Sequence, residues 1–64
     1  MSKASELVAI IAEAIKDLKE VPSGHLYSYV MGRIDLTTYN LIIEKLKEFG
    51  WIKVEHHLIT WIKD

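Results

Sequence analysis

The glycine at position 50 separates two segments whose hydrophobic residues follow different periods. Before it, residues 35–48 carry apolar side chains at the spacing of a helix; after it, residues 51–62 are rich in β-branched and aromatic types. Glycine ends many helices because it adopts the left-handed conformation with little strain. The chain is therefore predicted to run from a helix through Gly50 into a C-terminal two-stranded β-hairpin, with its turn near residues 55–58.

A first helix is predicted over residues 3–19, where apolar residues recur at helical spacing along one stripe. Val8 and Ala12 widen this apolar face. They either complete the core of the domain or face a second subunit. The stripe itself consists of Leu7, Ile10, Ile11, Ala14, Ile15 and Leu18.

The connection to a second helix is marked by Pro22, since the residue before a proline avoids helical geometry. Val21 is therefore predicted to be extended and to pair with the later hairpin. Ser23 is the expected cap of a helix over residues 24–31, and Gly32 is the expected left-handed residue that closes it. The side chains predicted to face inward from this helix are Leu26, Tyr29 and Val30.

The third helix is predicted to begin after Asp35, a residue type that caps helix N-termini well. Ile34, just before it, is expected in the core. The helical period places one set of residues inward, namely Tyr39, Ile42, Ile43, Leu46 and Phe49. It places another set outward, namely Thr37, Thr38, Asn40, Leu41, Glu44, Lys45 and Glu48.

Length and composition restrict the class of protein. The chain has 64 residues, 50% of them hydrophobic, no Cys and a formal net charge of −1, so we expect a single small packed domain over residues 1–64 without disulfides. No segment is basic, although nucleic-acid binders usually carry a positive stripe. The apolar run at residues 7–12 is far shorter than the roughly 20 residues that span a bilayer. We expect a cytoplasmic protein that does not engage a membrane.

Catalytic and metal sites are not favoured by the sequence. His25, His56 and His57 lack Cys or acidic partners at ligand spacing, and neighbouring residues on a strand point to opposite faces. Ser23, His25 and Asp35 contain the residue types of a hydrolytic triad, but no nucleophile elbow surrounds the serine. The three glycines punctuate elements and do not form a phosphate loop. The prediction is a non-enzyme without metal, cofactor or small-molecule substrate.

Three segments carry a resemblance to a known fold: LYSYVMG at residues 26–32, LKEFGWI at residues 46–52 and LIT at residues 58–60. Together with a preceding helix, they resemble the winged helix-turn-helix domain over almost the whole chain. The resemblance implies an α+β fold with a three-helix core and a C-terminal two-stranded β-hairpin.

The same resemblance implies a mode of DNA binding. In such domains the third helix enters the major groove, the start of the second helix meets phosphate, and the hairpin contacts the DNA backbone or minor groove. The chain departs from this pattern because Glu44 would repel phosphate and the hairpin has no arginine. The implied DNA contacts are Ser23, His25, Arg33, Thr37, Thr38, Asn40, Leu41, Lys45, Lys53, His56 and His57.

Two functions therefore compete at this point. The first is a DNA-binding winged-helix protein, such as a small transcriptional regulator. The second is a winged-helix module that binds a protein or forms a homodimer without binding DNA. A positive surface across Arg33, Lys45, Lys47 and Lys53 would favour DNA, and a neutral or acidic one would favour protein.

The protein-binding alternative has its own candidate residues. Tyr27 and Leu41 lie off the inward stripes and would form an apolar patch if both are exposed. Trp51 and Trp61 flank the open end of the hairpin, where they either cover the core or leave one ring exposed for a partner. The candidate interface residues are Val8, Tyr27, Leu41 and Trp61.

Overall fold

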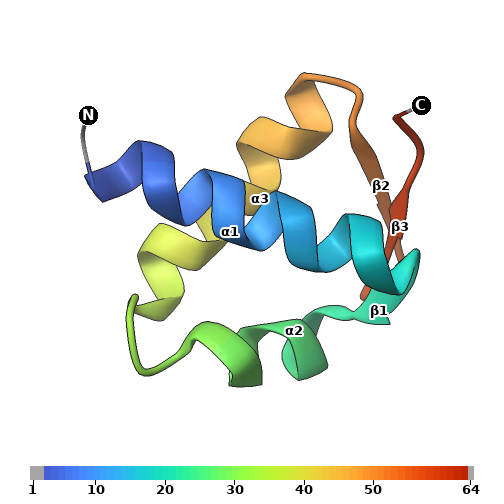
Figure 1. Cartoon of the computed structure of the whole chain (residues 1–64). Coiled ribbons are helices and arrows are strands. Elements are labelled where there is room, and N and C mark those ends of the chain that lie inside the picture. The colour runs from blue at the N-terminus through green and yellow to red at the C-terminus, as the bar shows by residue number, and fades with distance from the viewer. Residues whose placement is uncertain (1–2, 64) are drawn as a thin grey trace.

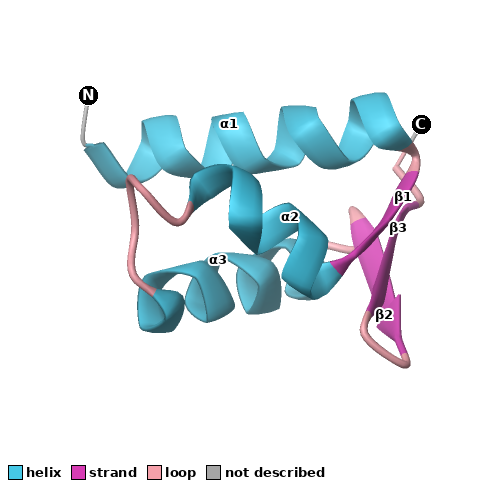
Figure 2. Ribbon diagram, turned by 90° about the horizontal axis from the view of Figure 1, so that it is seen from below, coloured by secondary structure: helices cyan, strands magenta, loops and turns pink. Residues whose placement is uncertain are grey.

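The chain folds into three helices and one three-stranded antiparallel sheet, an α+β architecture. The computed structural model describes residues 3–63, and Figure 1 shows helices α1, α2 and α3 packed across one another. Figure 2 shows the sheet at one end of the helices. The elements in chain order are α1 (Lys3–Leu18), β1 (Glu20–Pro22), α2 (Ser23–Val30), α3 (Leu36–Glu48), β2 (Ile52–Glu55) and β3 (Leu58–Trp61).

The sheet contains one strand more than the predicted hairpin. Strand β3 lies in the centre, with β1 on one side and β2 on the other, and both pairings are antiparallel. Val21 lies opposite Ile59, and both side chains are buried. The predicted pairing of Val21 with the hairpin is therefore confirmed, and the sheet has three strands because β1 adds to the two strands of the hairpin. The third strand forms because a lone hairpin buries too little surface to be stable in water.

Helix α1 directs most of the predicted stripe toward the core, but not all of it. Ile11 and Ile15 are fully buried as expected, but Ile10 is 40% exposed and Leu18 is also exposed. Ala12 is buried instead, because α1 packs against β1 and β3 as well as against α2. Ala12 thus belongs to the core of its own chain. The helix ends at Leu18, where Lys19 takes a left-handed conformation with φ of 71°.

Helix α2 begins one residue earlier than predicted, which changes the role of Ser23. The cap position is Pro22, which makes no side-chain capping bond, and Ser23 is the first helical residue. Only Leu26 and Val30 are buried on this eight-residue helix, and Tyr29 is 62% exposed, against expectation. The predicted left-handed closure at Gly32 is also wrong, since Gly50 is the glycine with positive φ among residues 3–63.

Helix α3 follows the prediction closely except at its end. The Asp35 carboxylate accepts a hydrogen bond from the Thr38 backbone N–H at 3.2 Å, so the predicted cap is confirmed. Hydrogen bonds from Thr38 also hold the pKa of Asp35 below its ordinary value. Phe49 is 57% exposed, because it follows the last helical turn and stacks on Trp51 with ring centroids 5.5 Å apart. The predicted inward residues Tyr39, Ile42, Ile43 and Leu46, and also Ile34, are buried.

The hairpin turn is formed by two histidines in the left-handed region. His56 and His57 have φ of 51° and 66°, the signs that a two-residue type I′ turn requires. Such turns favour Asn-Gly, because glycine has no Cβ atom to strain at positive φ and the short polar side chain of asparagine can hydrogen-bond locally there. The turn is also anchored, since the His57 carbonyl accepts a hydrogen bond from the Ser23 backbone N–H at 2.7 Å.

Replacing the turn with the residues that its geometry favours should stabilise the protein. We expect the double substitution His56→Asn with His57→Gly to raise the free energy of unfolding by about 1 kcal/mol, because strain at both positions is relieved. Urea denaturation followed by circular dichroism measures the change. Substitution of both histidines by Val should lower stability, and a gain with Val would contradict the assignment of strain.

The Tyr39 hydroxyl joins the start of α2 to the first turn of α3. It donates to the Ser23 carbonyl oxygen at 2.9 Å and lies 3.3 Å from the Ser23 hydroxyl, while the ring is buried. We expect Tyr39→Phe to cost about 1 kcal/mol of unfolding free energy, since the carbonyl loses its partner.

The same substitution should change the response to alkaline pH. Burial raises the pKa of Tyr39 above its ordinary value of 10.0. The neutral phenol therefore contributes stability that is present below pH 10.0 and is lost as the pH rises through the folded-state value. Thermal melting across this range should show a smaller alkaline loss for Tyr39→Phe than for the wild type; equal losses would contradict this role.

Candidate interaction surfaces

The outward side of α3 presents uncharged residues at its start. Thr37 and Asn40 are exposed and Leu41 is 60% exposed, as predicted. Thr38 is half-buried, and its backbone N–H is engaged by the Asp35 cap. The helix therefore offers Thr37, Asn40 and Leu41 to a partner.

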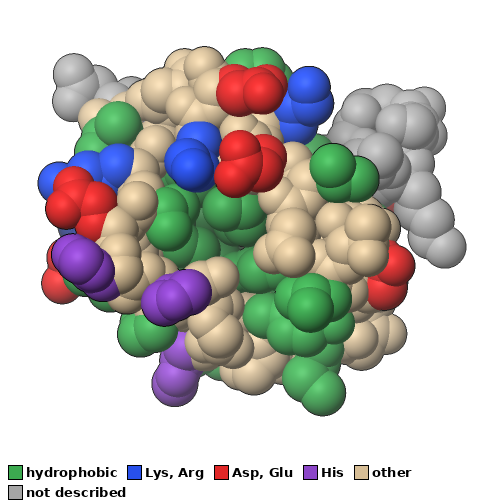
Figure 3. Space-filling view, turned by 180° about the vertical axis from the view of Figure 1, so that it is seen from behind, with side chains coloured by type: hydrophobic (Ala, Val, Ile, Leu, Met, Phe, Trp, Pro, Cys, Tyr) green, Lys and Arg blue, Asp and Glu red, His purple; other side chains and the backbone are tan. Residues whose placement is uncertain are grey.

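The lysines that follow on this side are matched by neighbouring acids. Lys45 lies 3.5 Å from Glu48, and Lys47 lies 3.5 Å from Glu44, each one helical turn apart. All these side chains are exposed, so the pairs add little stability. Their effect on the surface is nevertheless clear, because each cation has an anion beside it. Figure 3 shows the basic and acidic groups intermixed over this part of the molecule.

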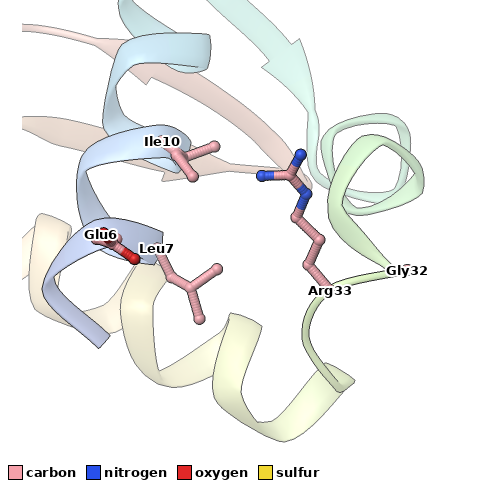
Figure 4. Close-up of a pocket in the computed structure, with 5 residues that line it drawn as sticks. All are labelled: Glu6, Leu7, Ile10, Gly32 and Arg33. Atoms are coloured by element: carbon pink, nitrogen blue, oxygen red, sulfur yellow. The ribbon is translucent and has the colours of Figure 1, made fainter. Parts of the chain in front are cut away.

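The hairpin repeats this balance, and Arg33 departs from it. Lys53 lies 3.7 Å from Glu55 on β2. Arg33 is exposed and forms no ion pair with any residue of the range 3–63. Arg33 borders a groove of about 390 Å³ with Glu6, Leu7, Ile10 and Gly32, and Figure 4 shows its side chain reaching from the α2–α3 turn toward Ile10 of α1.

The three histidines lie at the junction of the hairpin turn and α2. His56 and His57 form the turn, which confirms the turn predicted near residues 55–58, and the alternation of side chains along a strand does not apply to them. His25 stacks edge-on against Tyr29 with ring centroids 5.5 Å apart. All three imidazoles are exposed, and Figure 3 shows them along one side of the molecule. Within residues 3–63 no group of three His, Cys, Asp or Glu side chains is placed to hold a metal ion.

The predicted apolar patch of Tyr27 and Leu41 is only half available. Tyr27 is half-buried and packs against Tyr39 with ring centroids 5.0 Å apart, so its ring belongs largely to the domain itself. Other exposed apolar side chains on α2, α3 and the turn between them were missed by the sequence analysis. They are Tyr29, Met31 and Leu36, and Figure 3 shows hydrophobic groups gathered on this side.

Two of the predicted interface residues meet in a groove between α1 and the sheet. Val8 and Trp61 line it together with Trp51, and the groove has a volume of about 340 Å³. Both indole rings are half-buried, and their centroids lie 6.1 Å apart. The tryptophans thus cover the end of the core and also present ring surface to the groove, so the two predicted roles are combined. We call this site the Trp groove; its remaining lining residues are Ala9, Ala12, Glu13, Lys16 and Lys63.

Two of the residues that line the Trp groove, Lys16 and Lys63, are basic, and one, Glu13, is acidic. Neither Lys16 nor Lys63 forms an ion pair with a residue in the described part of the chain, although Glu13 also lines the groove. The Lys63 ammonium lies 5.1 Å from the centroid of the Trp51 ring, within the range of a cation–π interaction. The groove is therefore lined by two aromatic rings, by small residues, and by two lysines against one glutamate.

Comparisons with known proteins add no relative: no protein-family model, curated protein or solved structure matches this chain. The winged helix-turn-helix resemblance therefore stays a prediction from the sequence. Among residues 3–63 no helix is long and apolar enough to cross a membrane.

Proposed function

We propose that this chain is a small winged-helix-like module that binds another polypeptide through the Trp groove. The observation that carries the proposal is the contrast in charge between the two surfaces. The lysines of α3 and β2 each have an acid within 4 Å, at distances of 3.5 to 3.7 Å, whereas the lysines at the Trp groove have none among residues 3–63. A neutral α3 face is a poor match for phosphate, because phosphate neutralisation supplies most of the affinity for nucleic acid.

The groove supports a particular kind of occupant. Paired tryptophans with accessible ring surface are typical anchors of protein interfaces. The small side chains of Ala9 and Ala12 leave room between α1 and the rings for an apolar group. Lys16 and Lys63 at the rim favour a ligand with negative charge. The occupant that we propose is a polypeptide segment in which an apolar side chain is flanked by Asp or Glu.

A peptide library tests this specificity directly. Labelled peptides of about 12 residues would carry one Leu, Phe or Trp flanked either by acids or by lysines. Fluorescence anisotropy should show the acidic class binding with a Kd at least about tenfold lower than the basic class. The double variant Lys16→Glu with Lys63→Glu should remove this preference, because the rim then repels carboxylates.

The matched control is the double variant Lys45→Glu with Lys47→Glu on α3. It changes the net charge by the same amount but lies outside the groove, so the acidic preference should persist. Equal binding of both peptide classes, or an acidic preference that survives Lys16→Glu with Lys63→Glu, would contradict the proposed site.

Duplex DNA is a second candidate partner, supported by the arrangement of elements. The order α1-β1-α2-α3-β2-β3 agrees with the winged-helix resemblance, and the start of α3 exposes Thr37, Asn40 and Leu41. Asn contacts adenine and apolar groups contact the thymine methyl in major-groove recognition. Arg33, which has no ion-pair partner among residues 3–63, adds a cation to the edge of this surface.

The DNA candidate makes a prediction that separates it from peptide binding. Anisotropy of a labelled duplex should show affinity that falls steeply with salt and that weakens in Arg33→Ala and Lys53→Ala. The polypeptide proposal predicts a shallow or absent salt dependence instead, because the lysines of α3 and β2 each have an acid beside them. A steep salt dependence together with loss of binding in Arg33→Ala would favour DNA over the polypeptide partner.

A further inference from the structure

Strand β2 forms one edge of the sheet, and no other strand of residues 3–63 covers it. Strand β3 is covered by β1 on one side and β2 on the other, so β2 has a partner on one side alone. The Ile62 backbone N–H donates to the Trp51 carbonyl at 2.9 Å, and the antiparallel ladder continues from that bond. Because bonded and non-bonded pairs alternate along such a ladder, Lys53 and Glu55 direct their backbone groups toward β3. Ile52 and Val54 direct theirs toward the open edge.

We propose that a second copy of this chain occupies this edge, with the two β2 strands antiparallel about a two-fold axis at Val54. In this register Val54 lies opposite its own copy as a hydrogen-bonded pair, which uses the outward N–H and carbonyl groups of both chains. The sheets of the two copies then become one continuous sheet. A homodimer with closed two-fold symmetry is the commonest form of soluble oligomer.

Charge selects this register over its neighbours. With Val54 at the axis, Lys53 of each chain lies opposite Glu55 of the other, as a non-bonded pair whose Cα atoms are about 4.5 Å apart. Lys53 and Glu55 are both exposed, on the opposite face of the sheet from the buried Ile52. The ion pair that they form within one strand, at 3.7 Å, can therefore be exchanged for pairs across the interface.

The neighbouring registers that preserve the same hydrogen-bonding pattern are disfavoured. A shift in one direction, with Ile52 opposite Val54, brings Lys53 against Lys53. A shift in the other direction, with Val54 opposite His56, brings Glu55 against Glu55. Like charges directly opposite each other on neighbouring strands are destabilising. The β2 sequence is thus complementary to itself in the register centred on Val54.

The opposite edge of the sheet is less suited to a partner. Strand β1 is three residues long and ends at Pro22, which has no backbone N–H to donate. Strand β2 has four residues and no proline. Because β2 is short, the contact area is small and the association should be weak, with a dimer that forms at high protein concentration.

Reversing the charges of Lys53 and Glu55 tests whether these side chains pair between two copies of the chain or only support the fold of one copy. We expect sedimentation equilibrium of the full chain to show a mass that rises toward the dimer with concentration. Lys53→Glu alone and Glu55→Lys alone should each weaken self-association by about tenfold or more, since each places like charges opposite one another. An equimolar mixture of these two variants should form a heterodimer, because every cross-strand pair is then again of opposite charge.

The double variant Lys53→Glu with Glu55→Lys should restore the homodimer. The matched control is Lys47→Glu, which removes an ion pair on α3 and should leave the association unchanged. Circular dichroism verifies that each variant is folded. A monomer at all concentrations, a dimer insensitive to both single reversals, or a mixture of the single variants that stays monomeric would overturn the proposal. This surface is separate from the Trp groove, so peptide binding can fail while the dimer is retained.

Discussion

The pairing of β1 with β3 is the interaction on which the rest of the structure depends. It joins residues 20–22 to residues 58–60, and both side chains of its central pair, Val21 and Ile59, are buried in the core. The bonds beyond the strand ends extend it, from the Trp61 N–H to the Lys19 carbonyl and from the Ser23 N–H to the His57 carbonyl. Closing so long a loop costs entropy, which burial must offset. Without this pairing the hairpin would be an isolated ribbon of marginal stability.

The same pairing places both ends of the hairpin. At its open end it holds Trp61 against α1, and so creates the Trp groove. At its closed end it holds the histidine turn against the first residue of α2, whose N–H is then already bonded. The start of α2 therefore has one donor fewer for a phosphate than the winged-helix resemblance implies. The three-residue strand β1 thus supports the Trp groove as a binding site, and it makes the start of α2 less suited to bind phosphate.

Sequence periodicity predicted the elements well, and the particular contacts of each side chain less well. The third helix, its Asp35 cap and the Gly50 break followed from local rules, because cap chemistry and glycine conformation act within a few residues. Tyr29 and Phe49 were predicted to face inward, but both are exposed. The helical period gives the direction of a side chain, and it does not show whether another element packs there. Ser23 was expected to cap α2, but its side chain is used by Tyr39, which lies 16 residues away in the sequence. The Trp groove brings together residues from α1 and both ends of the hairpin, and no local pattern predicts that meeting.

Surface charge separates the candidate functions in a way that composition cannot. The sequence shows 8 basic and 9 acidic residues, which fits a neutral surface or a strongly divided one equally well. The structure pairs the lysines of α3 and β2 with acids, and leaves Lys16 and Lys63 beside the tryptophans. The two proposed binding surfaces, the Trp groove and the open edge of β2, use different parts of the same hairpin. The groove uses side chains next to the ends of β2 and β3, whereas the open edge uses the main chain at Val54, so neither surface requires the other to be occupied.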